Sequence, residues 1–470
     1  MANASIKFGT SGWRAIVADD FTHANVRRAV TGIARYVQTH KRSGAKVVVG
    51  RDPRYMGETF VAIAAQILSL HGITPLVITQ DAPTPAISFE ILRSHADGAI
   101  NFTASHNPSE YNGIKFNSAD GAPSLPEVTR AIEAEVLNAD QEGLSARHAD
   151  VAAPAQQIEV KSAYLARLKD IIDLKVIANS KLKVVYDALW GSGRGYPDQL
   201  LSEAGIPVAS IHEDRDVLFG GHAPEPEPEL LQEARARMRE TGAKICIATD
   251  GDADRFGIMD AEGTFLQPNY VIALLFDYLV ETRGWKNGVA KSVATTNMVN
   301  ALAHHHRVEL HETPVGFKYI GELIKQDKIA IGGEESAGLS IRHHVPEKDG
   351  IVAGLLCCEM VARRGKSLGD QLKDLFVEIG SFYPVRENFR LTPEVKEKFT
   401  TKLTSAPQEV FGRKVASIVR TDGLKLIFDD GAWICYRLSG TEPVVRVYTE
   451  ARSLADSRKL TAAAKDWVFA

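Results

Sequence analysis

Three aspartates at every second position, Asp250, Asp252 and Asp254, are the residues whose spacing most clearly indicates chemistry. They directly follow the apolar run ICIAT, and Arg255 comes next. Carboxylate oxygens are hard ligands that suit Mg²⁺ or Ca²⁺, and an adjacent arginine suits a site where phosphate meets metal. An EF-hand loop is excluded, because its sixth and twelfth positions require Gly and Glu, where this chain has Arg255 and Ala261. We therefore expect a divalent metal site and not a solvated acidic turn.

A serine that follows another apolar run is the candidate nucleophile. TASHNP spans residues 103–108, and its Asn107-Pro108 dipeptide predicts a turn that leaves Ser105 exposed at a strand end. A serine placed there can act as a nucleophile or carry a phosphoryl group. The alternative is that Ser105, with His106 beside it, only forms hydrogen bonds that stabilise the turn and has no catalytic role.

Two further loops suit a sugar and a phosphate. GGEESAG, residues 332–338, ends an apolar strand and offers Glu334 and Ser336 to hydroxyl groups, although by itself it is only a polar loop. RLSGTEP, residues 437–443, combines a guanidinium, hydroxyls and glycine, with Arg446 nearby, which suits a phosphate cradle. It is also the expected hairpin turn between ICYRL and VVRVYTE, and both interpretations can hold together.

The remaining motifs do not point to one specific function. GTSGWR, residues 9–14, suits anion binding and a plain turn equally. GSGRG at 191–195 lacks the G-x-G-x-x-G spacing of a nicotinamide site, and the adjacent histidines 304–306 lack the i, i+4 spacing of metal ligands. The alternating Pro and Glu of 222–229 predict a solvated loop leading into a helix at Leu230. Without a Walker motif, P-loop kinase chemistry is excluded.

The composition is that of a globular protein with a small-molecule partner. A chain of 470 residues, 44% hydrophobic and 24% charged, predicts three or four domains with clefts between them. The net charge of -4 argues against a nucleic-acid partner. A signal peptide and an apolar run of ~18 residues are both lacking, so we expect neither export nor membrane insertion. Four cysteines without a C-x-x-C pair fit a reducing compartment, and we predict a cytoplasmic protein.

The elements that must position these residues follow an α/β pattern. Short β-branched runs alternate with longer amphipathic or Ala-rich stretches, which predicts mostly parallel sheets covered by helices. In such sheets ligands gather beyond the carboxyl ends of the strands, and several predicted strands run directly into Gly, Ser, Asp or Glu. We also predict a helix over 368–379. The predicted strands span residues 46–50, 98–103, 181–187, 243–249, 292–295 and 328–332.

Together the five motifs GTSGWR, TASHNP, DGDADR, GGEESAG and RLSGTEP resemble those of the phosphoglucomutase and phosphomannomutase superfamily of phosphohexomutases, in that family's order. They extend from residue 9 to residue 443, so the resemblance covers nearly the whole chain. It implies four domains around a central cleft: three related α/β units with mixed, mostly parallel sheets, and a smaller C-terminal α+β domain. The phosphoserine, metal, sugar-binding and phosphate-binding loops would lie, in that order, in domains 1–150, 155–257, 258–375 and 380–470.

The resemblance implies that Ser105 carries the phosphoryl group. With the three aspartates of DGDADR, Ser105 would hold one Mg²⁺ per subunit, and Arg255 would lie beside the transfer site. Lys115 matches a family lysine near the phosphoserine and is a candidate proton acceptor, while Arg14 and His106 match neighbouring positions.

For the substrate, the resemblance implies contacts from the third and fourth domains. TPVGFK resembles the family's sugar-orienting loop, and Glu334 and Ser336 match its hydroxyl binders. HHVPEKDG resembles the stretch that follows in phosphoglucomutases, with a spacing that differs by one residue. The implied residues are Gly316, Lys318, His344 and the catalytic Lys348 in the third domain, and Arg437, Ser439, Gly440, Thr441 and Arg446 in the fourth.

We therefore predict an intramolecular phosphotransferase, a phosphoglucomutase that interconverts glucose 1-phosphate and glucose 6-phosphate as a monomer or homodimer. Glucose 1,6-bisphosphate would be its intermediate and activator, and the fourth domain would close while that intermediate turns. A phosphomannomutase or dual-specificity mutase is the alternative, disfavoured because Gly338 stands roughly where such enzymes often have a histidine. A phosphoglucosamine mutase comes third, because that branch tends to have SASHNP. A hydrolase would need a water-positioning group, and a non-catalytic sensor would usually have lost Ser105 or an aspartate.

Overall fold

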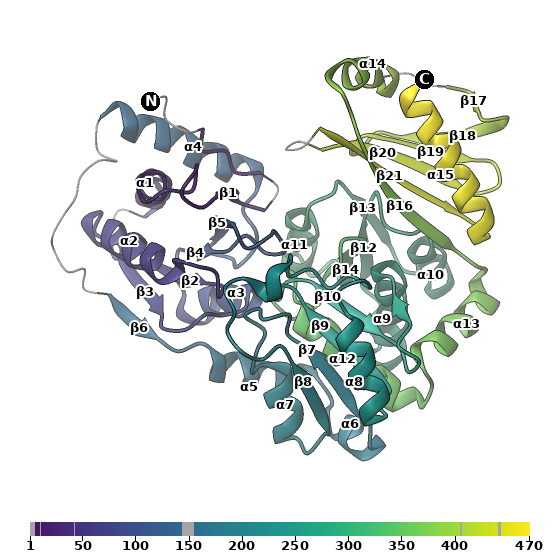
Figure 1. Ribbon diagram of the computed structural model, residues 1–470, viewed down its shortest axis with the longest axis horizontal. Helices are drawn as coiled ribbons and strands as arrows, with labels where there is room; N and C mark the ends of the chain where they lie inside the picture. Colours follow the sequence, from purple (N-terminus) through teal and green to yellow (C-terminus); the bar gives the residue numbers. More distant parts are fainter. Residues whose placement is uncertain (1–4, 10, 42, 143–154, 405–406, 440–442) are drawn as a thin grey trace.

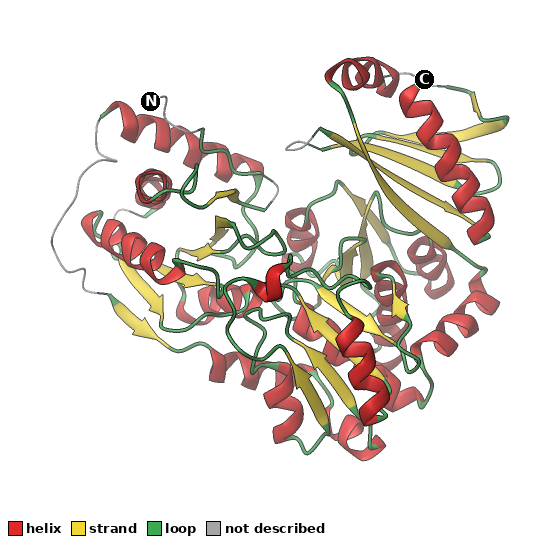
Figure 2. Cartoon of the chain, in the orientation of Figure 1, coloured by secondary structure: helices red, strands yellow, loops and turns green. Residues whose placement is uncertain are grey.

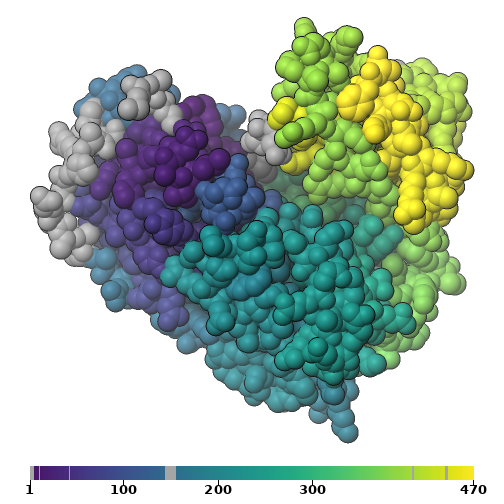
Figure 3. Space-filling model, viewed as in Figure 1, coloured from purple at the N-terminus to yellow at the C-terminus, as the bar shows by residue number. Residues whose placement is uncertain are grey.

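The computed structural model describes residues 5–9, 11–41, 43–142, 155–404, 407–439 and 443–470. Figures 1 and 2 show three layered α/β units followed by an antiparallel sheet with helices on it. In Figure 3 a hollow separates the first unit from the fourth. The predicted fold class is confirmed. Within the described part of the chain, none of the helices combines the length and the apolar character needed to cross a bilayer.

The first unit is a mixed sheet between two layers of helices. In strand β2, Val47 and Val49 pack in the core beneath α1 and α2, while Val48 faces the opposite core with α3, so both faces of the strand are buried. Its strands, in sheet order, are β1 Trp13–Ile16, β5 Tyr111–Ser118, β4 Gly98–Phe102, β2 Lys46–Arg51, β3 Thr74–Ile78 and β6 Gln156–Ile158. Its helices are α1 His23–His40, α2 Gly57–Leu70, α3 Thr84–Ser94 and α4 Pro126–Gln141.

The second unit has a parallel centre with an antiparallel edge. All five residues of β9, ICIAT, are buried, as expected for a strand covered on both faces. In sheet order its strands are β11 Phe265–Leu266, β10 Phe256–Met259, β9 Ile245–Thr249, β7 Val184–Asp187 and β8 Val208–Ile211. Its helices are α5 Lys161–Ile171, α6 Leu174–Ser180, α7 Pro197–Glu203 and α8 Gln232–Thr241, with a short 3₁₀ turn, η2 Phe219–Gly221.

The third unit repeats this arrangement. Strand β12 pairs in parallel with β13 and β14, and β15 returns antiparallel to β14. In sheet order the strands are β13 Leu310–Thr313, β12 Gly288–Ser292, β14 Ile329–Glu334 and β15 Gly338–Ile341. The helices are α9 Pro268–Arg283, α10 Met298–His306, α11 Phe317–Lys325, α12 Gly350–Arg364 and α13 Leu368–Ile379.

The fourth unit is an antiparallel sheet with its own core. Helix α15 packs on β16 and β21 and contributes Leu460, Ala464 and Val468 to that core. In sheet order the strands are β16 Tyr383–Arg390, β21 Val444–Ala451, β20 Trp433–Leu438, β19 Leu424–Phe428, β18 Arg413–Val419 and β17 Glu409–Val410. The helices are α14 Pro393–Leu403 and α15 Leu454–Phe469.

All but one of the predicted strands are confirmed, with their ends shifted by at most three residues, and α13 has the predicted bounds. The strand predicted over 292–295 is wrong, because β12 ends at Ser292. There the Thr295 amide donates to the Ser292 carbonyl, 3.0 Å away, so the β-branched residues that suggested a strand form a turn. Residues 222–229 form neither helix nor strand, and α8 begins two residues after Leu230.

Two of the predicted domain boundaries cut through sheets. Strand β6, 156–158, lies beyond the predicted break at 155 and yet pairs with β3 of the first sheet. Strand β10 spans the predicted break at 257, and β11 extends the second sheet to Leu266. The sheets place these boundaries after Ile158 and after Leu266. The sequence did not predict them, because backbone pairing across a sheet leaves little trace in local composition.

Candidate active site

Ser105 lies just beyond β4 in the left-handed region, with φ of 53°, a strained backbone conformation for serine. Its amide donates to Thr103 Oγ1 (2.8 Å), its hydroxyl donates to Asp250 Oδ2 (2.7 Å), and its Oγ lies 3.2 Å from His106 Nδ1. The predicted exposure of Ser105 is wrong: only 1% of the residue is accessible. The turn between β9 and β10 covers it, and a Cβ on Gly251 would lie 2.6 Å from the Ser105 carbonyl oxygen.

Arg54, which the motifs did not single out, holds the serine loop in place. Its guanidinium is fully buried, and Nε donates to Asp52 Oδ2 at 3.0 Å. Charge-assisted hydrogen bonds of this kind are stronger than neutral ones. Its remaining hydrogen bonds go to the carbonyl oxygens of the loop: Pro108 (2.7 Å), Tyr111 (2.9 Å), Ser105 (2.7 Å) and Asn107 (2.6 Å). The signal that could have found it is RDPR, residues 51–54, at the end of β2 and at the same sheet edge as TASHNP.

The three aspartates predicted to bind metal lie together and are fully buried, with one oxygen of each within 4.8 Å of the others. Oδ1 of Asp252 and Oδ1 of Asp254 have no hydrogen-bond partner among the described residues, although both atoms are buried. Buried carboxylate oxygens without partners are costly unless a cation takes them. The donor set, all carboxylate oxygen, therefore fits a hard divalent cation.

Cations from the first and third units surround these carboxylates. Lys115 Nζ lies 2.5 Å from Asp252 Oδ2 and 2.8 Å from Asp254 Oδ2, and Lys348 Nζ also lies 2.8 Å from Asp254 Oδ2. Burial disfavours the ammonium of Lys115, but the two carboxylates outweigh burial and raise its pKa. Arg255 pairs instead with Glu225 at 2.5 Å. The structure thus brings the predicted catalytic residues together from three units.

The same surroundings set the charge of His106 and the aspartates. Burial lowers the pKa of His106 well below its usual range, and the charges of Arg255 and Arg14 lower it further, so the imidazole is neutral at pH 7. Burial and the neighbouring carboxylates raise the pKa of Asp250. For Asp254 burial acts in the same direction, but Lys115, Lys348 and Arg255 prevail and hold its pKa well below normal.

The predicted sugar-binding residues of the third unit meet at the end of β14. Glu334 Oε1 accepts a hydrogen bond from the Gly316 amide at 2.7 Å, and burial, with the adjacent Glu335, raises the pKa of Glu334 to about 7. Ser336 lies half-buried in the turn between β14 and β15. Lys318 lies on the first turn of α11, largely buried, with Nζ 5.7 Å from the Tyr319 ring centroid.

His344 is not placed for a substrate contact. Its side chain is fully buried, and Nε2 lies 2.7 Å from Asp349 Oδ2, which also accepts a hydrogen bond from the Tyr164 hydroxyl. Asp349 in turn caps α12 by accepting from the Val352 amide at 2.9 Å. His344 therefore turns into the protein, whereas Lys348, four residues later, reaches Asp254 Oδ2 at 2.8 Å.

The predicted phosphate cradle lies partly outside the described residues. Arg437 and Arg446 face each other across β20 and β21, confirming the predicted hairpin strands, and Arg437 Nε bonds Asp422 Oδ2 at 2.9 Å. The Ser439 amide donates to the Val444 carbonyl at 3.0 Å. Gly440 and Thr441 lie outside the described part of the chain. In the first unit, Arg14 Nη1 donates to Asn107 Oδ1 at 2.6 Å, so it supports the serine loop.

Family models match this chain in four consecutive segments. Residues 5–143, 162–263 and 267–379 match the alpha/beta/alpha domains I, II and III of phosphoglucomutase/phosphomannomutase, and 393–466 match the C-terminal domain. The chain therefore belongs to the phosphoglucomutase/phosphomannomutase family. It is an enzyme of the phosphohexomutase class, an intramolecular phosphotransferase.

Individual relatives span the family's branches. A phosphoglucomutase/phosphomannomutase of Thermococcus kodakarensis is 30% identical over 96% of both chains. Human phosphoglucomutase-1 is 30% identical over 95% of this chain and 90% of its own, and a probable phosphoglucosamine mutase of Methanopyrus kandleri is 30% identical over 96% and 95%. A crystal structure from Thermus thermophilus, provisionally described as a phosphomannomutase, covers 99% of both chains with 31% identity and a TM-score of 0.86.

Proposed function

We propose that this enzyme interconverts glucose 1-phosphate and glucose 6-phosphate, with Ser105 as the phosphoryl carrier and glucose 1,6-bisphosphate as intermediate and activator. The observation that carries the proposal is the Ser105 hydroxyl, 2.7 Å from Asp250 inside a buried group of three aspartates ringed by cations. Phosphoryl transfer needs alignment and charge neutralisation, and little covalent work from the protein. This arrangement supports both needs.

Asp250, Asp252, Asp254 and the Ser105 oxygen would hold Mg²⁺ in this proposal. When bound, the ion supplies neutralisation of the phosphoryl charge. The unpartnered, buried oxygens of Asp252 and Asp254 support this assignment. Lys348 Nζ, 2.8 Å from Asp254 Oδ2, already neutralises part of the negative charge of the aspartates.

In the first half-reaction the oxygen of a sugar hydroxyl attacks the phosphorus of phosphoserine. The bond from phosphorus to Ser105 Oγ breaks, the hydroxyl proton goes to a base, and Ser105 Oγ takes a proton. Neutral His106, 3.2 Å from Ser105 Oγ, can exchange the serine proton. The charges of Asp252 and Asp254 keep Lys115 protonated. Lys115 can therefore accept the hydroxyl proton only when another partner neutralises these two carboxylates.

The sugar must then turn so that its other phosphate returns to Ser105. We assign its hydroxyls to the third unit, and the phosphate that is not reacting to the fourth. Glu334 must serve both orientations, and a carboxyl that titrates near neutral pH can both donate and accept hydrogen bonds. The assigned substrate contacts are Arg14, Gly316, Lys318, Glu334, Ser336, Arg437, Ser439, Gly440, Thr441 and Arg446.

A mannose-phosphate or dual-specificity mutase is the second candidate. The specific observation in its favour is the similarity to the Thermus thermophilus protein, which is provisionally described as a phosphomannomutase. Glucosamine phosphate is the third candidate, since the Methanopyrus kandleri relative is described as a probable phosphoglucosamine mutase.

The deciding experiment is a coupled assay with Mg²⁺ and catalytic glucose 1,6-bisphosphate. Glucose 1-phosphate, mannose 1-phosphate and glucosamine 1-phosphate are compared at equal concentration on the wild type. Preference for glucose 1-phosphate, dependent on the bisphosphate, supports the proposal. Preference for either other sugar moves the assignment to that candidate.

We further propose a cytoplasmic enzyme, monomeric or homodimeric. All four cysteines, Cys246, Cys357, Cys358 and Cys435, are buried free thiols, which suits a reducing compartment. Burial raises the pKa of the Cys435 thiol to about 12, which keeps it protonated and unreactive.

A further inference from the structure

A cavity of about 430 Å³ lies where the second and third units meet, at residues with no role in the proposed reaction. Helix α5 forms one wall, the end of α9 with Trp285 forms another, and Arg342 and His343 after β15 form the third. Cavities of roughly 300 to 1,000 Å³ are the usual size for small-molecule sites. This cavity therefore has room for a metabolite.

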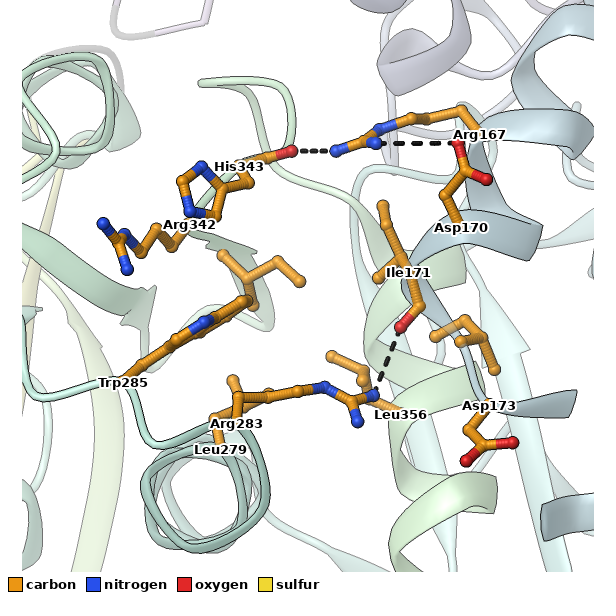
Figure 4. A pocket seen from close by; sticks show the side chains of 12 residues that line it. Arg167, Asp170, Ile171, Asp173, Leu279, Arg283, Trp285, Arg342, His343 and Leu356 are labelled. Atoms are coloured by element: carbon orange, nitrogen blue, oxygen red, sulfur yellow. Dashed lines mark hydrogen bonds and ion pairs between the residues drawn. The ribbon is translucent and has the colours of Figure 1, made fainter.

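Three arginines from three different elements line the cavity. Figure 4 shows Arg167 and Arg283 on opposite sides of it and Arg342 at a third corner, with the Arg342 guanidinium turned away from the other two. The hydrogen bonds of Arg283 all use Nη2, which contacts Glu359 (2.7 and 2.9 Å) and the Ile171 carbonyl (3.2 Å). Its Nε and Nη1 have no partner within the described ranges.

The other two arginines are also only partly engaged. Arg342 bonds Asp327 through Nε and Nη2, at 2.5 and 2.6 Å, while Arg167 Nη2 donates to the His343 carbonyl. Their side chains are 22% and 28% accessible, so their other N–H groups can reach a ligand. Two acidic side chains also line the cavity: Asp173 pairs with Arg363 at 2.7 Å, outside the lining, and Asp170 Oδ2 lies 3.8 Å from Arg167 Nη1. Guanidinium N–H groups pair best with phosphate or carboxylate oxygens.

The rest of the lining is apolar and includes an aromatic ring. Trp285 is half-buried and presents its indole beside the cavity, with the His343 ring centroid 5.9 Å from its own (Figure 4). The aliphatic part of this surface consists of Ile171, Ile172, Leu279, Ile341 and Leu356. Indole faces bind flat rings and the C–H faces of sugars, so the lining suits a ring-shaped body bearing anionic groups.

We propose that this cavity is a second ligand site, separate from the active site, which binds a phosphorylated ring compound. Phosphates would contact Arg167, Arg283 and Arg342, and the ring would lie against Trp285. Two sources share this chemistry, a nucleotide and a sugar bisphosphate. The inference goes beyond the proposed function, and binding can be measured without turnover.

The site is connected to the aspartates through packed backbone. Arg167 bonds the His343 carbonyl, and Tyr164 of the same helix bonds Asp349. The next residue, Gly350, donates its amide to the Ala253 carbonyl in the turn that carries the aspartates, at 3.1 Å. A ligand that bridges Arg167 and Arg342 would hold this segment, and we expect it to change turnover.

Isothermal titration calorimetry of the whole protein with ATP and with fructose 1,6-bisphosphate tests the site. We expect at least one probe to bind, and Arg167→Gln, Arg342→Gln and Trp285→Ala each to weaken it about tenfold. Arg237→Gln, which removes an exposed arginine of α8 paired with Glu240, is the matched control and should bind as the wild type does. Arg14→Gln, at the active site, separates binding of the sugar bisphosphate there from binding in the cavity, and should leave the affinity for ATP unchanged.

Binding by only one probe, weakened by the cavity variants, identifies the source. No heat from either probe at millimolar concentration, or unchanged affinity in all three cavity variants, overturns the proposal. Thermal denaturation of the variants shows whether they are folded, and Arg342→Lys, which keeps the charge without the fork, should be intermediate. The effect on turnover rests on the proposed function, whereas the calorimetry does not. Binding without any change in turnover therefore rejects only the link to the active site.

Discussion

At the scale of single residues, the site is governed by the balance of buried charge. Three buried carboxylates would repel one another strongly without cations. Lys115 and Lys348 supply two positive charges, both at 2.8 Å or less from a carboxylate oxygen. The Ser105 hydroxyl is held in the same charged environment, which is why its substitution is the most direct test of the chemistry.

Ser105→Ala should reduce turnover by at least about 10³-fold, because it removes the phosphoryl carrier. The assay is glucose 1-phosphate turnover with catalytic glucose 1,6-bisphosphate, and mass spectrometry of the wild type should find one phosphate on Ser105. Ser202→Ala, at an exposed serine, should behave as the wild type does. Appreciable turnover by Ser105→Ala would rule out the phosphoserine mechanism.

Arg54→Lys should lower both stability and turnover. Lysine cannot reach four carbonyl oxygens and Asp52 together, and disrupting such a buried charged network costs about 3–5 kcal/mol. We expect a lower Tm and a kcat reduced more than KM is raised, because Ser105 loses its position and not its substrate contacts. Arg237→Lys is the exposed control. An Arg54→Lys enzyme with wild-type Tm and kcat would show that the loop holds its own shape.

Glu334 should make the protein less stable as pH rises. Its pKa is raised from 4.5 to about 7 in the folded state, so the stabilisation from the bound proton is complete below pH 4.5 and lost as pH rises through 7. The interval corresponds to about 3 kcal/mol. Thermal unfolding of the wild type between pH 4.5 and 8 should show this loss, and Glu334→Gln should not. Glu240→Gln, at an exposed glutamate, should keep the wild-type profile; identical profiles for wild type and Glu334→Gln would contradict the assignment.

At the scale of elements, the turn between β9 and β10 carries the three carboxylates that could hold a metal ion. It follows a fully buried strand, and Ala253 within it has φ of 57°, so this backbone is held in a strained conformation beside the aspartates. Thr84 at the start of α3 ties it to the first unit by donating to Asp252 Oδ2 at 2.5 Å.

Mg²⁺ should therefore raise the Tm, because binding adds about 2.7 kcal/mol to the free energy of unfolding when the Mg²⁺ concentration is 100 times Kd. Adding EDTA should reverse the shift. Asp252→Asn should remove most of it, because one charged oxygen ligand is lost. Asp374→Asn, at an exposed aspartate paired with Lys366, should leave it intact. The absence of any Mg²⁺-dependent shift in the wild type would argue against a metal site here.

At the scale of the whole molecule, the fourth unit meets the third through buried polar contacts. Glu450 accepts hydrogen bonds from the Asn297 amide (2.9 Å) and from the Trp433 indole N–H (2.8 Å). Lys425 bonds the Val293 carbonyl at 2.9 Å. In Figure 3 the hollow lies between the first and fourth units. Motion of the fourth unit toward the first would therefore enclose a ligand in the hollow.

We expect glucose 1,6-bisphosphate to close this hollow. Small-angle X-ray scattering should show a smaller radius of gyration with the bisphosphate than without it, and Arg437→Gln, which removes a predicted phosphate contact, should reduce the change. Trapping experiments should find that little bisphosphate escapes during turnover. An unchanged radius together with ready escape would exclude closure.

Local pattern was enough to predict the fold class, most strands and the aspartates. Buried strands such as β9 carry unbroken apolar runs, α13 carries helical periodicity, and DGDADR is contiguous. A pattern within a few residues suffices for such features, because the backbone period and the ligand chemistry are both local.

Features that depend on contacts between distant residues could not be predicted from local pattern. Ser105 is buried because Asp250 and Gly251, 145 and 146 positions later, cover it. His344 turns inward because Asp349 and Tyr164 bind there, and Arg54 reaches carbonyls that no local spacing relates to it. The cavity beside Trp285 likewise exists only where two units meet. Local motifs therefore identified the groups available for catalysis, whereas packing between units set their exposure, charge and partners.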